Sequence, residues 1–233
     1  MQEFEDLEAV VSNASNAGIT GMICCGADLE SSKKAIEIAS KFPSVWATAG
    51  IHPESNDDPL EIENLLNFPK VVAVGECGLD SDNPQEESLL KSQLELAQKY
   101  NLPLVVHNRK QDAKILKILG NYPKIMLHCF TSDMEFMKEC VRRGWYISFG
   151  GIVTFKSSHA LRETAKAVPE NRLLIETDAP YLAPEPVRGS RNVPTNVKIV
   201  AIKIAEVRGT SINQIEKITS ENCKLLFFKT NHN

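Results

Sequence analysis

The sequence lacks an apolar run long enough to cross a membrane, and its N-terminus is acidic where a signal peptide is basic and then apolar. It also lacks an excess of positive charge, because the formal net charge is −4 and the pI is about 5.8. This balance excludes a protein that holds nucleic acid by neutralising phosphates over a wide face, so any nucleic-acid contact has to be local. Low-complexity tracts, long linkers and short repeats are absent too, which favours one compact domain.

The six cysteines form no CxxC pair, which argues against a redox or zinc motif. Cys24 and Cys25 are adjacent within an apolar run that is typical of a strand. We interpret the cysteines as reduced core thiols and therefore expect a cytoplasmic location. Neither Cys77 nor Cys129 has neighbours that indicate a nucleophile.

Short runs rich in Val, Ile and Leu alternate with longer segments of helical period, which is the pattern of βα units around a parallel sheet. The 233 residues are enough for one large core, and we expect a single domain over residues 1–233. The predicted strands are residues 19–25, 45–51, 71–75, 104–107, 125–128, 145–149 and 173–177. The predicted helices are residues 31–41, 59–67, 85–100, 110–120, 134–143, 159–168, 194–207 and 211–227.

Apolar residues also recur at helical spacing between Phe4 and Ala14, ahead of the first predicted strand. A helix followed by seven strands is the pattern of an eight-stranded TIM-type (β/α) barrel without its opening strand. The expected fold class is therefore α/β. Expected helix N-caps are Asp28 or Ser31 for one helix, and Ser132 and Ser211 for two others.

Five residues of metal-ligand or acid–base type close apolar runs. Because the carboxyl ends of parallel strands meet at one mouth, these side chains are expected to converge there. Imidazole and carboxylate groups together suit Zn²⁺, Mn²⁺ or Mg²⁺. The five residues are His52, Glu76, His107, His128 and Asp178.

Each of these residues also has an ordinary structural explanation. A histidine that ends a strand is often only a hydrogen-bonded core or rim residue. Glu76 follows apolar and small residues, so an ion pair with Arg109 is an alternative to a metal for a carboxylate at that position. Asp178 precedes Ala-Pro and can serve as a turn former. Three strand-ending histidines among the five in the chain favour a site over chance.

Several motifs, in this order and spacing, resemble those of TatD-type metal-dependent deoxyribonucleases of the amidohydrolase superfamily. The resemblance extends from about Phe4 to Phe227, nearly the whole chain, and it is the combination of motifs that makes it specific. The motifs are Gly50-Ile-His52-Pro53, Gly75-Glu76-Cys-Gly78-Leu79-Asp80, Val106-His107-Asn-Arg109, His128-Cys-Phe130, Ser148-Phe-Gly150-Gly151 and Glu176-Thr-Asp178-Ala-Pro180-Tyr181-Leu182.

The resemblance implies a divalent-metal-dependent hydrolase that cleaves DNA phosphodiester bonds from strand ends. It implies that Glu76 bridges two ions, that His107 and His128 bind one of them, and that Asp178 binds the other. Glu76 and Asp178 are then the catalytic residues, with Asp178 orienting or deprotonating the attacking water. The residues implied to line the substrate site are His52, Arg109 and Glu176.

Members of the family open with a strand that ends in a His-x-His pair, and nothing before Phe4 supplies that pair. The family pattern is two metal ions. Glu76, His107 and His128 form a three-ligand set with open positions, which catalytic metals prefer. We therefore expect one retained ion, with reduced or absent nuclease activity, in this exact chain.

Two alternatives to a DNA-cleaving enzyme stay open at this stage. The same ligands polarise carbonyl groups, so an amidohydrolase that cleaves a C–N bond is the second candidate. A catalytically inactive scaffold or nucleic-acid-binding remnant is the third, because the His-x-His ligands are missing. A barrel with no site at all ranks last. The expected partner is DNA, with neither a membrane nor an obligate protein partner.

Overall fold

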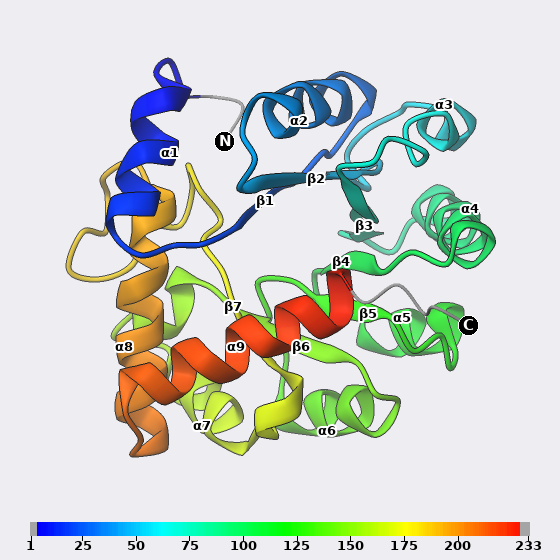
Figure 1. Ribbon diagram of the computed structural model, residues 1–233. Coiled ribbons are helices and arrows are strands. Elements are labelled where there is room, and N and C mark those ends of the chain that lie inside the picture. Colours follow the sequence, from blue (N-terminus) through cyan, green and yellow to red (C-terminus); the bar gives the residue numbers. More distant parts are fainter. Residues whose placement is uncertain (1–3, 229–233) are drawn as a thin grey trace. The chain divides into compact units, whose positions relative to one another are not determined.

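The computed structural model describes residues 4–228 (Figure 1). The chain consists of two compact units, Met1–Met126 and Leu127–Asn233. The single domain expected over residues 1–233 stays a prediction. Within the described residues, none of the helices combines the length and the apolar character needed to cross a membrane.

In the first unit, each strand lies beside the next one along the chain, and the pairs β1–β2, β2–β3 and β3–β4 are parallel. Helix α2 packs on β2, and α4 packs on β3. The elements are α1 (Leu7–Asn16), β1 (Met22–Cys24), α2 (Leu29–Lys41), β2 (Val45–Ala49), α3 (Pro59–Glu63), β3 (Val71–Leu79), α4 (Pro84–Tyr100), β4 (Leu104–Asn108) and α5 (Asp112–Leu119), followed by β5 (Ile125–Leu127) at the unit boundary.

Local signals in the sequence explain where the helices of this unit begin. The Asp28 carboxylate accepts from the backbone N–H of Ser31, and the Ser31 hydroxyl accepts from that of Asp28, so α2 starts with a capping box. Pro59 and Pro84 occupy the first positions of α3 and α4, where a missing N–H costs nothing.

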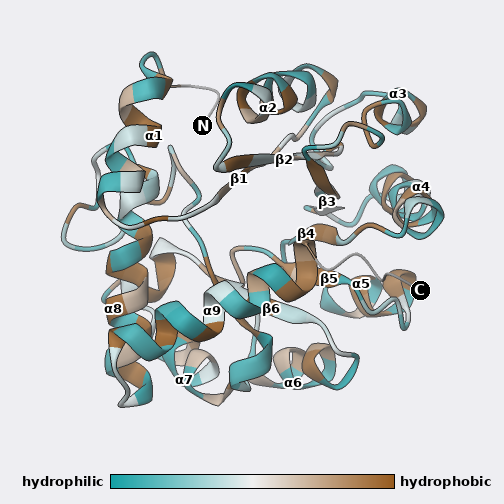
Figure 2. Cartoon of the chain, viewed as in Figure 1, coloured by the Kyte–Doolittle hydropathy of each residue, from teal (hydrophilic) through white to brown (hydrophobic). Residues whose placement is uncertain are grey.

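In the second unit, β6 and β7 are parallel neighbours, and helix α9 packs against β7. The Asn222 side chain donates to the backbone carbonyls of Glu170 and Leu173, which fixes α9 to the start of β7. Apolar and polar residues alternate along α8 and α9 (Figure 2). The elements are α6 (Met134–Arg142), β6 (Tyr146–Phe149), the 3₁₀ helices η1 (Gly151–Thr154), η2 (Glu170–Arg172) and η3 (Pro194–Asn196), with α7 (His159–Ala167), β7 (Leu173–Ile175), α8 (Val197–Arg208) and α9 (Ile212–Phe227).

The predicted fold class is confirmed. Residues 4–228 contain seven strands, each overlapping a predicted one, and α1 precedes the first of them. Parallel strands that alternate with helices in chain order are the arrangement of the TIM-type α/β fold.

Several element boundaries differ from the prediction, and three of the differences have a clear local cause. The third strand continues to Leu79, because its pairing with β4 shifts register after Val74 and resumes at Cys77. The helix expected over 59–67 ends at Glu63, because the backbone bonds beyond it tighten to three-residue spacing. Asp133 rather than Ser132 caps α6, since its carboxylate accepts from the N–H of Phe136.

Candidate metal centre

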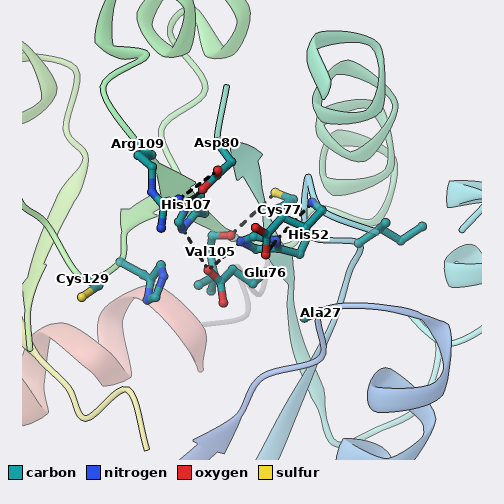
Figure 3. A network of polar contacts seen from close by, with 12 residues as sticks. Ala27, His52, Glu76, Cys77, Asp80, Val105, His107, Arg109 and Cys129 are labelled. Atoms are coloured by element: carbon teal, nitrogen blue, oxygen red, sulfur yellow. Dashed lines mark hydrogen bonds and ion pairs between the residues drawn. The ribbon is translucent and has the colours of Figure 1, made fainter. Parts of the chain in front are cut away.

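Three side chains of the first unit form a compact donor cluster (Figure 3). One ligand atom each from His52, Glu76 and His107 lies within 4.8 Å of the others. Glu76 Oε1 is 3.3 Å from His107 Nδ1 and 3.8 Å from His52 Nε2, and the two imidazole rings meet edge to face with centroids 4.6 Å apart. Imidazole nitrogens around a carboxylate are a donor set that divalent transition metals and Zn²⁺ accept.

The backbone around Glu76 is tightly packed because glycines flank it. A Cβ on Gly75 would lie 2.6 Å from the carbonyl oxygen of Val105, and a Cβ on Gly78 would collide with the carbonyl group of His107. The buried hydroxyl of Thr48 donates to the Gly75 carbonyl and accepts from the N–H of Gly26. Together these contacts let β3 approach β4 closely and fix the backbone that carries Glu76.

His107 is held by a carboxylate that the sequence analysis had not singled out. Asp80 Oδ1 lies 2.9 Å from His107 Nε2, and Asp80 Oδ2 accepts from Arg109 Nη1 at 3.1 Å. A neutral His107 that donates its Nε2 proton to Asp80 keeps the Nδ1 lone pair on the side of Glu76, as a metal ligand requires. The sequence left open an ion pair between Arg109 and Glu76 in place of a metal. In the structure, Arg109 forms an ion pair with Asp80.

His52 has a different hydrogen-bonding pattern from His107. Its Nδ1 accepts from the backbone N–H of Glu54 at 3.2 Å, so the neutral ring carries its proton on Nε2, the atom that faces Glu76. Burial lowers the pKa of His52, and the charge of Glu76 opposes this shift only in part. His52 thus presents a donor rather than a lone pair, which suits hydrogen bonding to an anion better than metal ligation.

In the second unit, Glu176 organises the segment around His128. Its Oε1 lies 3.2 Å from His128 Nδ1 and accepts from the N–H of Cys129 at 2.5 Å, and its Oε2 accepts from the Ser148 hydroxyl at 2.8 Å. The carboxylate can therefore fix the orientation of the His128 ring, with the Nδ1 proton directed at Glu176. The family resemblance implies a substrate role for Glu176, and its hydrogen bond with Ser148 is a contact that the sequence pattern does not indicate.

Three other residues that the sequence singled out have contacts explained by a turn, by packing or by burial. The Asp178 carbonyl accepts from the N–H of Tyr181 at 2.6 Å, so a backbone turn does follow Asp178. A Cβ on Gly151 would collide with the carbonyl of Leu182, which explains this glycine by packing. Burial raises the pKa of the Cys77 thiol well above its usual range, which is consistent with the absence of a nucleophile there.

The contacts of Asp80 and Ser148 differ in how visible they are in the sequence. Asp80 is the last residue of the motif that contains Glu76, which lies four positions before it. The pairing of β3 with β4 brings both carboxylates to His107. Ser148 lies within an apolar strand, and only its register opposite Leu174 on β7 brings it near Glu176. Such cross-strand partners depend on register, which the sequence pattern does not specify.

The chain matches known proteins along almost its full length. The family model described as TatD related DNase matches residues 1–228. A metal-dependent hydrolase of Bacillus subtilis, YabD, is 37% identical, with 95% of this chain and 92% of that protein covered. A protein of Citrobacter koseri named 3′-5′ ssDNA/RNA exonuclease TatD is 36% identical, with coverages of 97% and 94%.

Solved structures support the same relationship. The TatD homologue YJJV from Escherichia coli superposes with a TM-score of 0.89 at 28% identity, covering 96% of this chain and 92% of that one. A TatD family hydrolase from Entamoeba histolytica gives a TM-score of 0.87 at 28% identity, with coverages of 98% and 91%. Since the family model and relatives above 30% identity both span nearly the whole chain, this protein belongs to the TatD related DNase family and is a metal-dependent hydrolase.

Proposed function

We propose that this protein is a metal-dependent exonuclease that removes nucleotides from the 3′ end of single-stranded DNA. The observation that carries the proposal is the Glu76 carboxylate, which lies 3.3 Å from His107 Nδ1 and 3.8 Å from His52 Nε2 in a TatD-family chain, so that a ligand pair and an anion donor meet at one group. Strand polarity and preference for single strands are taken from the relative named as a 3′-5′ ssDNA/RNA exonuclease.

The proposed metal ligands are Glu76, His107, His128 and Asp178. Support comes from within each unit, because His107 is oriented by Asp80 and His128 by Glu176, the carboxylate–histidine arrangement usual behind metal ligands. A divalent cation such as Mg²⁺, Mn²⁺ or Zn²⁺ would polarise a phosphoryl oxygen there and lower the pKa of a water molecule. Glu76, His107 and His128 make one complete three-ligand set, so we propose one tightly held ion per chain.

The chemistry proposed for the protein's own groups is hydrolysis of a phosphodiester. A water oxygen bonds to phosphorus, and the bond from phosphorus to the 3′ oxygen of the preceding nucleotide breaks. That oxygen keeps the electron pair and takes a proton from solvent, which leaves a 3′ hydroxyl on the shortened strand and releases a nucleoside 5′-monophosphate. Asp178 would accept the proton of the attacking water. His52 would donate from Nε2 to a phosphate oxygen, and the largely exposed guanidinium of Arg109, held at one end by Asp80, would donate to a second. Glu176 would also line the substrate site.

The experiment follows a 5′-labelled single-stranded oligonucleotide with Mg²⁺ or Mn²⁺. In line with the reduced activity expected of a single retained ion, we expect a slowly forming ladder of shortening labelled strands, released 5′-monophosphates, complete arrest by chelator and loss of the products in His128→Ala. His159→Ala is the matched control, because His159 is an exposed histidine on α7, and it should leave the ladder unchanged. The same assay with a single-stranded RNA measures the preference between the two nucleic acids.

Two results would replace the proposal. Metal-dependent opening of a cyclic amide without any DNA hydrolysis would favour the C–N amidohydrolase. Binding of DNA that persists with chelator, while hydrolysis is undetectable, would favour the inactive scaffold. Metal analysis of the purified chain addresses the ion number, where two tightly held ions would contradict the one-ion proposal.

We also propose a cytoplasmic enzyme that needs no obligate protein partner. None of the six cysteines, which all lie within the described residues, is part of a disulfide, as expected where thiols are kept reduced. Fractionation of cells tests this location. Recovery of the protein in the periplasmic or secreted fraction would contradict it.

A further inference from the structure

Helix α4 carries two buried polar side chains that the proposed chemistry does not use. Glu86 is 6% exposed and Gln93 is 0% exposed. They are seven residues apart, close to two helical turns, so they lie on the same face of the helix. That helix packs on β3 (Figure 1), the strand that contains Glu76 and that Asp80 follows directly.

Glu86 is a buried carboxylate whose partners are not cations. Its Oε2 accepts from the backbone N–H groups of Asp80 at 2.7 Å and Ser81 at 2.9 Å, and its Oε1 accepts from the Ser81 hydroxyl. Burying a carboxylate is costly unless hydrogen bonds compensate it, so three donors on one loop hold that loop firmly. The loop begins at Asp80, the residue that contacts His107 Nε2.

Gln93 makes an equivalent clamp on the neighbouring loop. Its Oε1 accepts from the N–H of Ile51 at 2.8 Å, and its Nε2 donates to the carbonyl of Ile51 at 2.9 Å. Both backbone groups of Ile51 are therefore fixed, and the next residue along the chain is His52. Its ring meets that of His107.

We propose that Glu86 and Gln93 are positioning residues, with Glu86 setting the orientation of His107 through Asp80 and Gln93 setting that of His52 through Ile51. The inference rests on the proposed function, because it concerns the same two histidines. It predicts that each α4 residue acts on its own histidine. A helix that merely stabilised the fold would affect both rings alike or neither.

The test records the ¹⁵N signals of the histidine rings in the metal-free protein, which report which ring nitrogen carries the proton, and then titrates the protein with Mn²⁺. Glu86→Leu should change the His107 signals and leave those of His52, and it should weaken Mn²⁺ binding by about tenfold. Gln93→Leu should change the His52 signals and leave those of His107.

Conservative and control variants sharpen the comparison. Glu86→Gln keeps an oxygen for the two backbone N–H groups, and its amide can donate to the Ser81 hydroxyl, so it should restore the wild-type signals and Mn²⁺ affinity. Glu95→Leu is the matched control, because Glu95 is an exposed residue of the same helix. Its signals and affinity should equal those of the wild type.

Unchanged His107 signals and unchanged Mn²⁺ affinity in folded Glu86→Leu would overturn the proposal for Glu86, and unchanged His52 signals in Gln93→Leu would overturn that for Gln93. If Glu86→Leu does not fold, Ser81→Ala decides, because it removes one donor to Glu86 from an exposed residue. It should shift the His107 signals in the same direction, and no shift overturns the proposal. Failure of the wild type to bind Mn²⁺ would contradict the proposed function instead, since the ring signals are read without metal.

Discussion

His107 Nε2 lies 2.9 Å from Asp80 Oδ1, while His107 Nδ1 lies 3.3 Å from Glu76 Oε1. One imidazole therefore links two carboxylates that are both largely covered, Glu76 at 17% and Asp80 at 15% side-chain exposure. Because a ring nitrogen that donates to a carboxylate fixes the tautomer of the other, Asp80 determines which atom of His107 can serve as a ligand.

Replacement of Asp80 should weaken metal binding without unfolding the protein. Asp80→Ala removes the acceptor behind His107, and we expect the Mn²⁺ dissociation constant to rise by about 10–100-fold. Asp82→Ala is the control, since Asp82 pairs with Lys114 at the surface. Calorimetric titration of both variants measures the effect, and equal affinities in the two would show that Asp80 does not orient the ligand.

A parallel prediction concerns Glu176 in the second unit. Glu176→Ala leaves three donors, at His128, Cys129 and Ser148, without their acceptor, and should lower the free energy of unfolding by about 2–4 kcal/mol. Glu176→Gln retains one accepting oxygen and should cost less. Glu163→Ala, an exposed change on α7, serves as control. Urea unfolding measures all three, and a Glu176→Ala protein as stable as the control would refute the role given to this carboxylate.

The close approach of β3 and β4 predicts a strong effect of a methyl group at Gly78. Gly78 has φ +153, and an added Cβ would collide with the His107 carbonyl. Gly78→Ala should cost about 3 kcal/mol or more in the free energy of unfolding. Gly18→Ala isolates the conformational part, because Gly18 has φ +86 and no atom within 4 Å of its added Cβ. That control should lose about 1–2 kcal/mol, and similar losses in both variants would contradict the packing argument.

Tyr122 gives a prediction for alkaline pH. Its hydroxyl donates to the carbonyls of Ala97 and Leu102 at the C-terminal end of α4, and burial raises its pKa to about 12. Because the folded-state pKa is raised, the stabilisation is fully present below the unfolded value of about 10 and is lost as pH rises through about 12.

Tyr122→Phe should therefore lower the free energy of unfolding by about 1–3 kcal/mol at pH 8 and have little additional effect above pH 12. Tyr100→Phe, which removes only a hydroxyl contact with the partly exposed Glu63, should cost less. Guanidinium unfolding at several pH values compares them. A Tyr122→Phe difference that stays constant across the alkaline range would mean that the phenol is not held neutral by the fold.

The sequence was enough to predict the seven strands and to single out His52, Glu76 and His107, which the structure brings together, because these residues follow or end apolar runs. The metal roles of His128 and Asp178 stay predictions. The sequence was not enough for the partners of these residues. Glu76 lies inside β3 rather than at its end, since the register shift after Val74 extends the strand. Glu86 was overlooked because a Glu in the first turn of a helix usually faces solvent, and only the packing of α4 on β3 buries it.

Calorimetric titration of the metal-free protein with Mn²⁺, run side by side on the wild type and Glu76→Ala, tests the central claim most directly. The carboxylate of Glu76 is the group shared by both histidines of the cluster. We predict saturable binding by the wild type and loss of that binding in a folded Glu76→Ala protein. Equal Mn²⁺ binding by the two proteins would contradict a metal centre built on Glu76.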